Sequence, residues 1–348
     1  MLVAWLDELD PDEAIRVGGS KMGRLVELER IGAQVPRAFT VTVEAFLQHL
    51  AGSGLDTLID EAMLELDPED ALLVESAADR IRGAVMQTPL SQELASIIVD
   101  QYDELCDQCS ELNVPTAVRS SATGEDGSDA SFAGIFDTFL GVSGATRVME
   151  AVQACWASLF SPRAVSYRAR RGISHREMPM AVGVVELVQA KCSGVAFSVH
   201  PVTGKDDRVV VESNWGWGEA VVQGLVTPDH FEVGKADRRI LRRHVNEKRV
   251  VSAFDFATGR VAETEMPTRL RGRLSLDDEQ LLAVVDAVLA VEAHYGYPVD
   301  VEWVIDRHRR HGDPVHLVQT RPVTVVEAAV KPAYDPVALA NRHIFGRA

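Results

Sequence analysis

Hydrophobic positions in the first third of the chain recur mainly at helical spacing. Residues 21–31 place apolar side chains about one turn apart, namely Met22, Leu25, Leu28 and Ile31. Pro36 then opens a short extended stretch at residues 39–42, and residues 43–112 predict helices in several pieces. The clearest of these pieces carries one apolar stripe formed by Leu94, Ile97, Ile98, Tyr102 and Leu105.

From Val114 onward the pattern is typical of β-structure. We expect strands at 114–120 and 135–142 around a polar, glycine-containing loop, and a helix at about 144–160. Two apolar runs follow at 180–190 and 194–200, and Lys191-Cys192-Ser193 between them predicts a hairpin turn. Residues 208–247 are predicted to be mainly β, interrupted by a glycine-rich segment at 215–218.

The last third combines one strong helix with two strands. The helix is expected at about 276–294, where residues 275–278 resemble a capping box. Its buried stripe would be Leu281, Val284, Val285, Val288 and Leu289. Strands are expected at 298–306 and 315–321, and residues 331–348 are predicted to be a tail or linker. Helices and mostly antiparallel strands are mixed rather than alternating, which predicts an α+β fold.

The final strand pair carries the most informative polar residues. In the segment 299–306 the apolar residues alternate onto one face, and Asp300, Glu302 and Asp306 fall on the other. If Asp306 and Val315 flank the connecting loop, antiparallel counting places Glu302 opposite Gln319. A carboxylate and an amide oxygen side by side suit Mg²⁺ held largely by substrate phosphates, and Arg321 on the same face suits a phosphate oxygen pair. On periodicity alone, a surface hairpin with solvated polar residues explains the pattern equally well.

Two other segments are candidate phosphate contacts. Arg119 ends a predicted strand and is followed by hydroxyls and glycines through Gly127, where small residues would let backbone N–H groups approach an anion. Gly18-Gly19-Ser20-Lys21 precedes a helix and offers a lysine as a point charge, although the segment is not a P-loop. Taken alone, each segment is also compatible with an ordinary polar turn.

Composition narrows the classes of protein that fit. The chain has 348 residues and a net charge of -17, which disfavours non-specific contact with nucleic acid or an anionic membrane. The N-terminus lacks a basic segment and no apolar run reaches the length of a membrane span, so we expect a cytoplasmic protein. The four cysteines include one lone CxxC, Cys106 to Cys109, which we interpret as structural because no second pair has zinc-site spacing.

Taken in order, several long segments resemble a known family. The segments are GSK at 19–21, RLVELERIGAQVPRAFTVTVEAF, AVRSSATGEDGSDASFAGIFDTFLGV, SGVAFSVHPVTG, VVVESNWGWGEAVVQGLVTPDHFEV and VDVEWVIDRHRRHGDPVHLVQTRPVTV. They resemble the N-terminal nucleotide-binding domain of phosphoenolpyruvate synthase, pyruvate phosphate dikinase and rifampicin phosphotransferase over roughly residues 15–325. The resemblance implies an ATP-grasp-like fold of two lobes, which we expect at residues 1–183 and 184–330.

The resemblance also implies roles for individual residues toward ATP and Mg²⁺. Lys21 and Arg119 match contacts to the nucleotide phosphates, and Gly134 and Thr138 match the glycine-rich cover. Glu302 and Gln319 match the Mg²⁺ ligands, and Arg321 matches the arginine of the closing Q-x-R-P motif. The strand-face argument groups Glu302, Gln319 and Arg321 independently, which favours a ligand site over the surface hairpin.

The chain departs from the family pattern at several positions. Val185-Glu186-Leu187 stands where the family has Gln-Lys/Arg-Met, so Glu186 would contact adenine either through its side chain or only through its backbone. The usual W-G-L-G-E reads Trp215-Gly216-Trp217-Gly218-Glu219, and Ile135-Phe136 replace a more polar pair. These changes are compatible with neutral variation or with a different docking partner.

None of the ten histidines stands in the Gly-Gly-x-Thr-Ser-His context of the family's phosphohistidine domain. His175 and His200 have other neighbours, and we interpret every histidine as structural or superficial. The resemblance therefore implies an ATP-dependent phosphotransferase subunit that passes phosphate to a histidine on a partner subunit. Among split systems of this kind, the ATP-binding subunit of phenylphosphate synthase fits best, with phenol or a related acceptor.

Two alternatives stay open. The chain could be the nucleotide-binding domain of a fused enzyme of the rifampicin phosphotransferase or phosphoenolpyruvate synthase type, although its start and end do not favour this reading. It could also be a non-catalytic nucleotide-sensing scaffold. A scaffold predicts degraded phosphate and metal positions, yet the sequence keeps all five, namely Lys21, Arg119, Glu302, Gln319 and Arg321.

Overall fold

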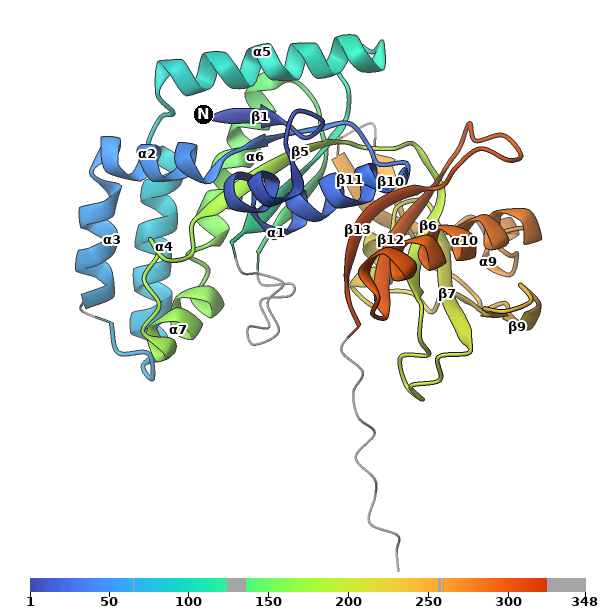
Figure 1. Cartoon of the computed structure of the whole chain (residues 1–348). Coiled ribbons are helices and arrows are strands. Elements are labelled where there is room, and N and C mark those ends of the chain that lie inside the picture. Colours follow the sequence, from blue (N-terminus) through green and yellow to red (C-terminus); the bar gives the residue numbers. More distant parts are fainter. Residues whose placement is uncertain (65, 124–135, 256–257, 259, 324–348) are drawn as a thin grey trace, which may run out of the picture.

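The strands form two separate antiparallel sheets and a two-stranded ribbon (Figure 1). The computed structural model describes residues 1–64, 66–123, 136–255, 258 and 260–323. The first sheet and helices α2 to α7 make up one side of the molecule, and the second sheet with α9 and α10 makes up the other. The α+β class with antiparallel sheets is confirmed.

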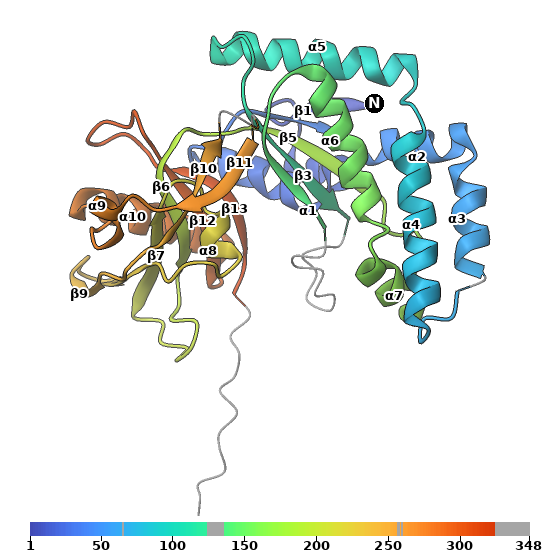
Figure 2. The same cartoon turned by 180° about the vertical axis from the view of Figure 1, so that it is seen from behind.

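The first sheet has the strand order β1-β2-β5-β3-β4. Its strands are β1 (Val3–Trp5), β2 (Ala38–Val41), β3 (Thr116–Ala122), β4 (Thr138–Val142) and β5 (Met180–Glu186). The helices on this side are α2 (Val43–Ser53), α3 (Leu55–Leu64), α4 (Ala71–Gln87), α5 (Gln92–Cys109), α6 (Ala145–Ser158) and α7 (Pro162–Arg171). Figure 2 shows α6 lying over β3 and β5. The helix and these strands share one apolar core, which includes Phe46 and Trp156.

The second sheet has the strand order β13-β12-β6-β7-β8-β9. Its strands are β6 (Ala190–Phe197), β7 (Arg208–Trp215), β8 (Asp229–Gly234), β9 (Ile240–His244), β12 (Val299–Asp306) and β13 (His316–Pro322). The remaining elements are α8 (Glu219–Val222), the ribbon of β10 (Val250–Asp255) and β11 (Arg260–Glu265), α9 (Thr268–Arg271) and α10 (Asp278–Tyr295). A capping box between Asp277 and Gln280 begins α10, and α10 packs on β6, β7 and β12.

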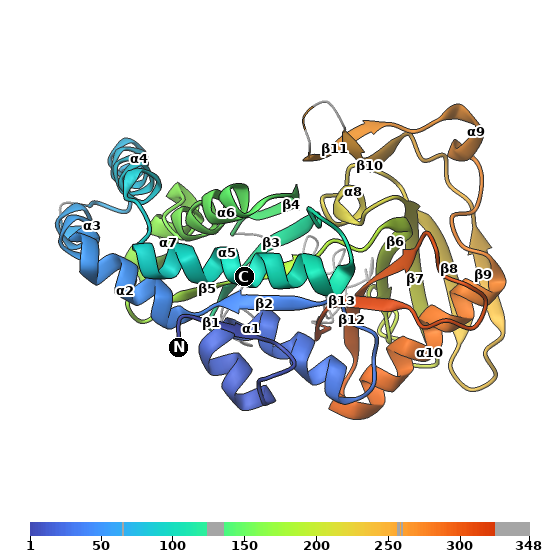
Figure 3. The same ribbon diagram turned by 90° about the horizontal axis from the view of Figure 1, so that it is seen from above.

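Helix α1 (Pro11–Arg30) packs against strands of both sheets, as Figure 3 shows from above. It begins ten residues before the predicted segment, capped by Asp10, and it kinks at Gly19, whose φ is 76°. A Cβ at Gly19 would lie 2.1 Å from the carbonyl oxygen of Ser121, so the kink needs glycine for both its backbone angle and its space. Beyond the kink, Met22, Leu25 and Leu28 join the core of the second sheet.

The predicted hairpin at 191–193 is wrong. These residues lie inside β6, and the two apolar runs belong to different sheets, so the chain crosses between sheets at residues 187–189. β5 pairs with β2 and β3 and is buried along almost its whole length. Its residues are therefore apolar on both faces, and no alternation distinguishes the end of β5 from the start of β6. The predicted lobe boundary at 183 and 184 stays a prediction.

The predicted pairing of Glu302 with Gln319 is confirmed. β12 and β13 pair Val299 with Pro322 through Glu302 with Gln319, and the register then shifts so that Trp303 faces Leu317. Val318 is thus the extra residue of a β-bulge, and the counting that anchored Asp306 to Val315 is off by one at the loop end.

Four of the five predicted stripe residues of α5 are buried, and Ile97 is half-buried.

Several sequence-based predictions fall on residues outside the described part of the chain. They are the polar loop at 124–127, Gly134 and the tail at 331–348. Within the described ranges, no helix is long and apolar enough to cross a bilayer. Cys106 and Cys109 lie in the last turn of α5 as free thiols, Cys106 buried and Cys109 half-buried, which supports the structural interpretation of this pair.

Candidate functional site

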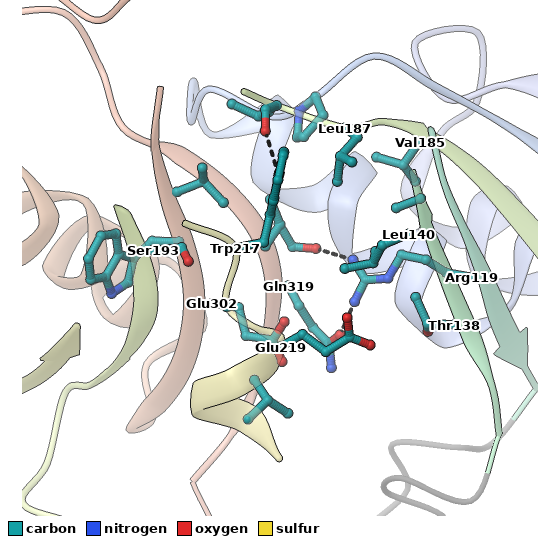
Figure 4. Close-up of a pocket in the computed structure, with 18 of the residues that line it drawn as sticks. Arg119, Thr138, Leu140, Val185, Leu187, Ser193, Trp217, Glu219, Glu302 and Gln319 are labelled. Carbon is teal, nitrogen blue, oxygen red and sulfur yellow. Dashed lines mark hydrogen bonds between the residues drawn. The ribbon is translucent and has the colours of Figure 1, made fainter. Parts of the chain in front are cut away.

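A cavity of about 440 Å³ opens between the two sheets, and residues from both line it (Figure 4). Every described residue that the sequence nominates for the site lies in its wall: Lys21, Arg119, Thr138, Glu186, Glu302, Gln319 and Arg321. Gly134 lies outside the described residues. Residues separated by up to 300 positions in the chain therefore face one space.

The kink of α1 brings Lys21 to the end of β3. Its Nζ donates to the carbonyl oxygen of Ser120 at 3.1 Å. The Met22 N–H donates to Ser121 Oγ at 3.3 Å, and Ser20 Oγ donates to the Ala122 carbonyl at 3.4 Å. These bonds satisfy groups at the start of the second helical segment and hold Lys21 beside the strand that carries Arg119.

Arg119 joins the two sheets. It leaves β3 opposite Thr138 on β4, and its Nη1 donates to the Val318 carbonyl oxygen at 2.7 Å. Its Nη2 donates to Gln319 Oε1. Val318 is the bulged residue of β13, so Arg119 donates to the strand pair at the point where the pairing of β12 with β13 changes register.

Two cross-strand pairs on one face of the sheet, Asp300 with Arg321 and Glu302 with Gln319, are separated by the Val301–Thr320 pair. Arg321 Nε donates to Asp300 Oδ2 at 2.6 Å. Asp300 is only 6% exposed, and burial raises its pKa above the usual range of an aspartate, an effect that Arg321 opposes. Asp300 therefore fixes the direction of the Arg321 guanidinium beside the second pair.

The Glu302–Gln319 pair fits a magnesium site of a particular kind. Mg²⁺ usually takes one or two protein oxygens and completes its shell with water and substrate phosphates. Glu302 and Gln319 supply one carboxylate and one amide oxygen on neighbouring strands. Among the described residues no cluster of three or more His, Cys, Asp or Glu side chains could hold a metal by itself. The donor set therefore suits a metal that arrives with a phosphate ligand.

The other end of the cavity is apolar. Leu140, Val185 and Leu187 line it from the first sheet and the crossover, and Trp217 lines it from the loop before α8. Trp217 Nε1 donates to the Val188 carbonyl oxygen at 2.9 Å. Glu186 stands at the edge, where its Oε2 accepts from the Arg37 N–H at 3.3 Å and lies 3.6 Å from the Arg37 guanidinium.

No sequence-based prediction assigns a role to Asp300, Trp217 or Glu219. Figure 4 shows the Glu219 carboxylate beside Gln319 and Glu302, and burial together with Glu263 raises its pKa. The W-G-x-G-E pattern around residues 215–219 is the signal that could have found Trp217 and Glu219. Gly216 has a φ of 72°, and a Cβ there would lie 2.3 Å from the Ser252 carbonyl oxygen, so the turn that presents both residues requires glycine.

Comparison with known proteins gives a consistent picture. Residues 15–338 match the family model described as pyruvate phosphate dikinase, AMP/ATP-binding domain. The chain is 37% identical over 329 residues to a probable phosphoenolpyruvate synthase of Methanothermobacter thermautotrophicus, which covers 94% of this chain and 47% of the relative. It is 38% identical over 337 residues to phosphoenolpyruvate synthase of Escherichia coli, covering 93% of this chain and 42% of the relative.

The chain spans less than half the length of these two relatives. The matched family model covers most of the chain and includes every residue nominated for the site, from Lys21 to Arg321. The domain that the model describes has an ATP-grasp-like fold, in agreement with the two antiparallel sheets around one cavity. The chain therefore belongs to the family of the AMP/ATP-binding domain of pyruvate phosphate dikinase and the phosphoenolpyruvate synthases.

Proposed function

We propose that this chain binds Mg-ATP in the cavity between its sheets and donates a phosphoryl group to a histidine on a partner subunit. One observation carries the proposal. Lys21, Arg119 and Arg321 line a single cavity together with the Glu302–Gln319 pair. In a chain whose net charge is -17, a local group of three cations is what a triphosphate would need.

Each cation has a distinct part in the proposed binding. Lys21 supplies a compact charge at the kink of α1, and Arg321 supplies a guanidinium that Asp300 orients on the face of the Glu302–Gln319 pair. Arg119 would exchange the Val318 carbonyl and the Gln319 amide for phosphate oxygens, which are the stronger acceptors. That exchange would free Gln319 Oε1 for a metal ion. Magnesium, held by Glu302 and Gln319, would neutralise phosphate charge.

The family resemblance implies the chemistry. A histidine nitrogen of the partner attacks the β-phosphorus of ATP, the bond from that phosphorus to the oxygen of the α-phosphate breaks, and AMP leaves. Water then releases the γ-phosphate as Pi, and the β-phosphoryl remains on the histidine for the acceptor. Lys21, Arg119 and Arg321 would stabilise the charge that develops on the phosphate oxygens, and closure of the two lobes would exclude water while the histidine attacks.

The surroundings of two histidines support a partner as the source of the acceptor histidine. His175 is buried, and its Nε2 lies 2.9 Å from Asp56 Oδ1. His200 Nδ1 accepts from the N–H groups of Val202 and Thr203 at 3.2 and 3.3 Å. Both side chains are used locally, and neither lines the cavity.

The phosphoryl acceptor is proposed from resemblance alone. The first candidate is the ATP-binding subunit of phenylphosphate synthase, which the chain resembles, and it makes phenol or a related compound the first acceptor to test. The second candidate is the nucleotide-binding part of an enzyme of the phosphoenolpyruvate synthase or rifampicin phosphotransferase type. The identities of 37% and 38% to phosphoenolpyruvate synthases favour that candidate.

Transfer of a labelled phosphate tests the proposal. ATP labelled at the β-phosphate should label a histidine of the co-purifying partner, and only when this chain is present. Absence of labelling with every co-purifying protein would contradict phosphoryl donation. If Arg321→Ala or Glu302→Ala left turnover of the partner unchanged, the non-catalytic scaffold would be the better reading.

A further inference from the structure

Hydrogen bonds fix both the main chain and the side chain of Trp217. Its backbone N–H donates to the Ser252 carbonyl oxygen at 3.2 Å, and its indole Nε1 donates to the Val188 carbonyl oxygen at 2.9 Å. Ser252 Oγ also accepts from the Ala220 N–H at 3.1 Å, which ties the residues after the tryptophan to the same point on β10. Both the main chain and the ring plane are therefore set before any ligand arrives.

The ring rests on a small apolar cluster. Val188, Ala190 and Val304 form this cluster, each less than 10% exposed, and Trp217 and Val318 pack against it. Packing on this cluster and the hydrogen bond from Nε1 restrict rotation of the indole into the cavity. Trp217 is half-buried, so part of its surface remains open to that space.

The opposite wall is aliphatic. Figure 4 shows the indole edge-on, with Leu187, Val185 and Leu140 on the side of one of its faces. The carboxylates of Glu302 and Glu219 and the amide of Gln319 lie at the other end of the same cavity. A flat apolar slot beside a polar, phosphate-compatible end has the shape and chemistry of a nucleobase compartment.

We infer that Trp217 is the stacking wall for the nucleobase and determines the preference for a nucleotide over bare polyphosphate, an inference that rests on the proposed function. The base would lie flat between the indole and the aliphatic wall. An aromatic face attracts any base through its π-system, so the residue selects for a base rather than for one hydrogen-bonding pattern. In this chain the tryptophan stands where the family pattern has leucine, so the base would gain an aromatic surface.

Calorimetric titration of the full chain with ATP and with inorganic tripolyphosphate, both with Mg²⁺, tests the inference. Trp217→Leu should weaken ATP binding about 5- to 150-fold, because stacking of one base contributes about 1–3 kcal/mol, while tripolyphosphate binding should stay the same. Trp217→Phe should keep most of the ATP affinity because it keeps an aromatic face. Trp5→Phe, on β1 of the first sheet, is the matched control and should bind both ligands like the wild type.

Tryptophan fluorescence gives a second readout. ATP should change the emission of the wild type and of Trp5→Phe, and the change should largely disappear in Trp217→Phe, whereas tripolyphosphate should produce little change in any of them. Equal ATP affinity in the wild type and Trp217→Leu would overturn the role of Trp217 and leave the proposed function standing. A parallel loss of ATP and tripolyphosphate binding in Trp217→Leu would also overturn it. A wild type that binds neither ligand would contradict the proposed function itself.

Discussion

Arg119 on β3 donates to the main-chain carbonyl oxygen of Val318 on β13 at 2.7 Å, across 199 positions of the chain. Val318 has no partner of its own on β12, because it is the extra residue of the bulge between the Glu302 and Trp303 pairings. The bulge thus provides an acceptor that a regular ladder would not present there. The contact links the first sheet, where Lys21 bonds to β3, to the second sheet, which carries the proposed metal ligands Glu302 and Gln319.

Arg119→Lys is expected to impair phosphoryl transfer strongly. A single ammonium cannot contact the Val318 carbonyl and the Gln319 amide together, and it cannot hold two phosphate oxygens in a fixed fork. Loss of one well-placed electrostatic donor typically costs about 10²–10³ in rate. Transfer of label from ATP to the partner histidine measures the effect. Arg16→Lys, at an exposed i,i+3 pair with Glu13, is the control and should leave transfer unchanged.

The Glu302–Gln319 pair can be tested by exchanging its members. Glu302→Gln should raise the Mg²⁺ concentration needed for half-maximal ATP binding, because the site loses its carboxylate. The double variant Glu302→Gln with Gln319→Glu keeps one carboxylate and one amide on paired strands and should recover part of the loss. A magnesium titration of ATP affinity measures both. If the two variants and the wild type required the same Mg²⁺ concentration, this pair would not be the metal site.

The features that the sequence predicts well are local. Glu302 and Gln319 lie on consecutive strands, so period-two alternation places them on one face. Counting from Asp306 and Val315 pairs them correctly because the bulge at Val318 compensates for an anchor that is off by one. The bulge at Val318 was not predicted, because nothing in the alternation of residues 315–321 indicates an extra residue. The hairpin at 191–193 failed because β5 is apolar on both faces, which hides where one strand ends and the next begins.

The features that the sequence misses depend on contacts between distant segments. The kink of α1 exists where Gly19 meets Ser121, about one hundred positions away, and no local pattern reports that approach. Trp217 and Glu219 become part of the cavity only because Ser252, on a separate ribbon, fixes their turn. Lys21 and Arg119 could be nominated from family motifs. That they lie close together depends on the packing of α1 against both sheets, which the sequence alone does not predict.

Asp300→Asn should make the affinity for ATP less dependent on pH in the acidic range. Burial raises the pKa of Asp300, so its proton binds the folded protein more tightly than the unfolded chain. Its contribution to stability is therefore least favourable above the folded-state pKa and improves as the pH falls toward the unfolded value of about 3.9. The affinity for ATP should instead fall as the pH falls, because a protonated Asp300 no longer holds Arg321 as an ion pair.

The measurement is a pH profile of ATP binding from neutral pH down to about pH 4. The wild type should lose affinity as Asp300 takes up its proton, and Asp300→Asn should start from the weaker level and show a shallower fall. Asp206→Asn, at an exposed position, should follow the wild-type profile. Superimposable profiles for the wild type and Asp300→Asn would show that the carboxylate does not position Arg321.

A separate prediction concerns the stability of the second sheet, where Lys248 and Asp229 form an ion pair closed to solvent. Lys248 Nζ lies 2.6 Å from Asp229 Oδ1, and both side chains are 0% exposed. The other carboxylate oxygen accepts from the Ser275 N–H at 2.9 Å and from Ser275 Oγ at 2.8 Å, just before α10 begins. The pair therefore connects β8 to the start of the helix that covers the sheet.

Lys248→Met should lower the free energy of unfolding by about 3–5 kcal/mol, because it leaves the Asp229 carboxylate buried without a cation. Adding Asp229→Asn should restore part of that loss, since the uncompensated charge is then gone and Asn can still accept from Ser275. Lys205→Met, at an exposed lysine, should change the free energy of unfolding by no more than about 0.5 kcal/mol. Urea denaturation of the four proteins measures these differences. A double variant no more stable than Lys248→Met would mean that lost packing around the lysine stem, and not the stranded carboxylate, sets the cost.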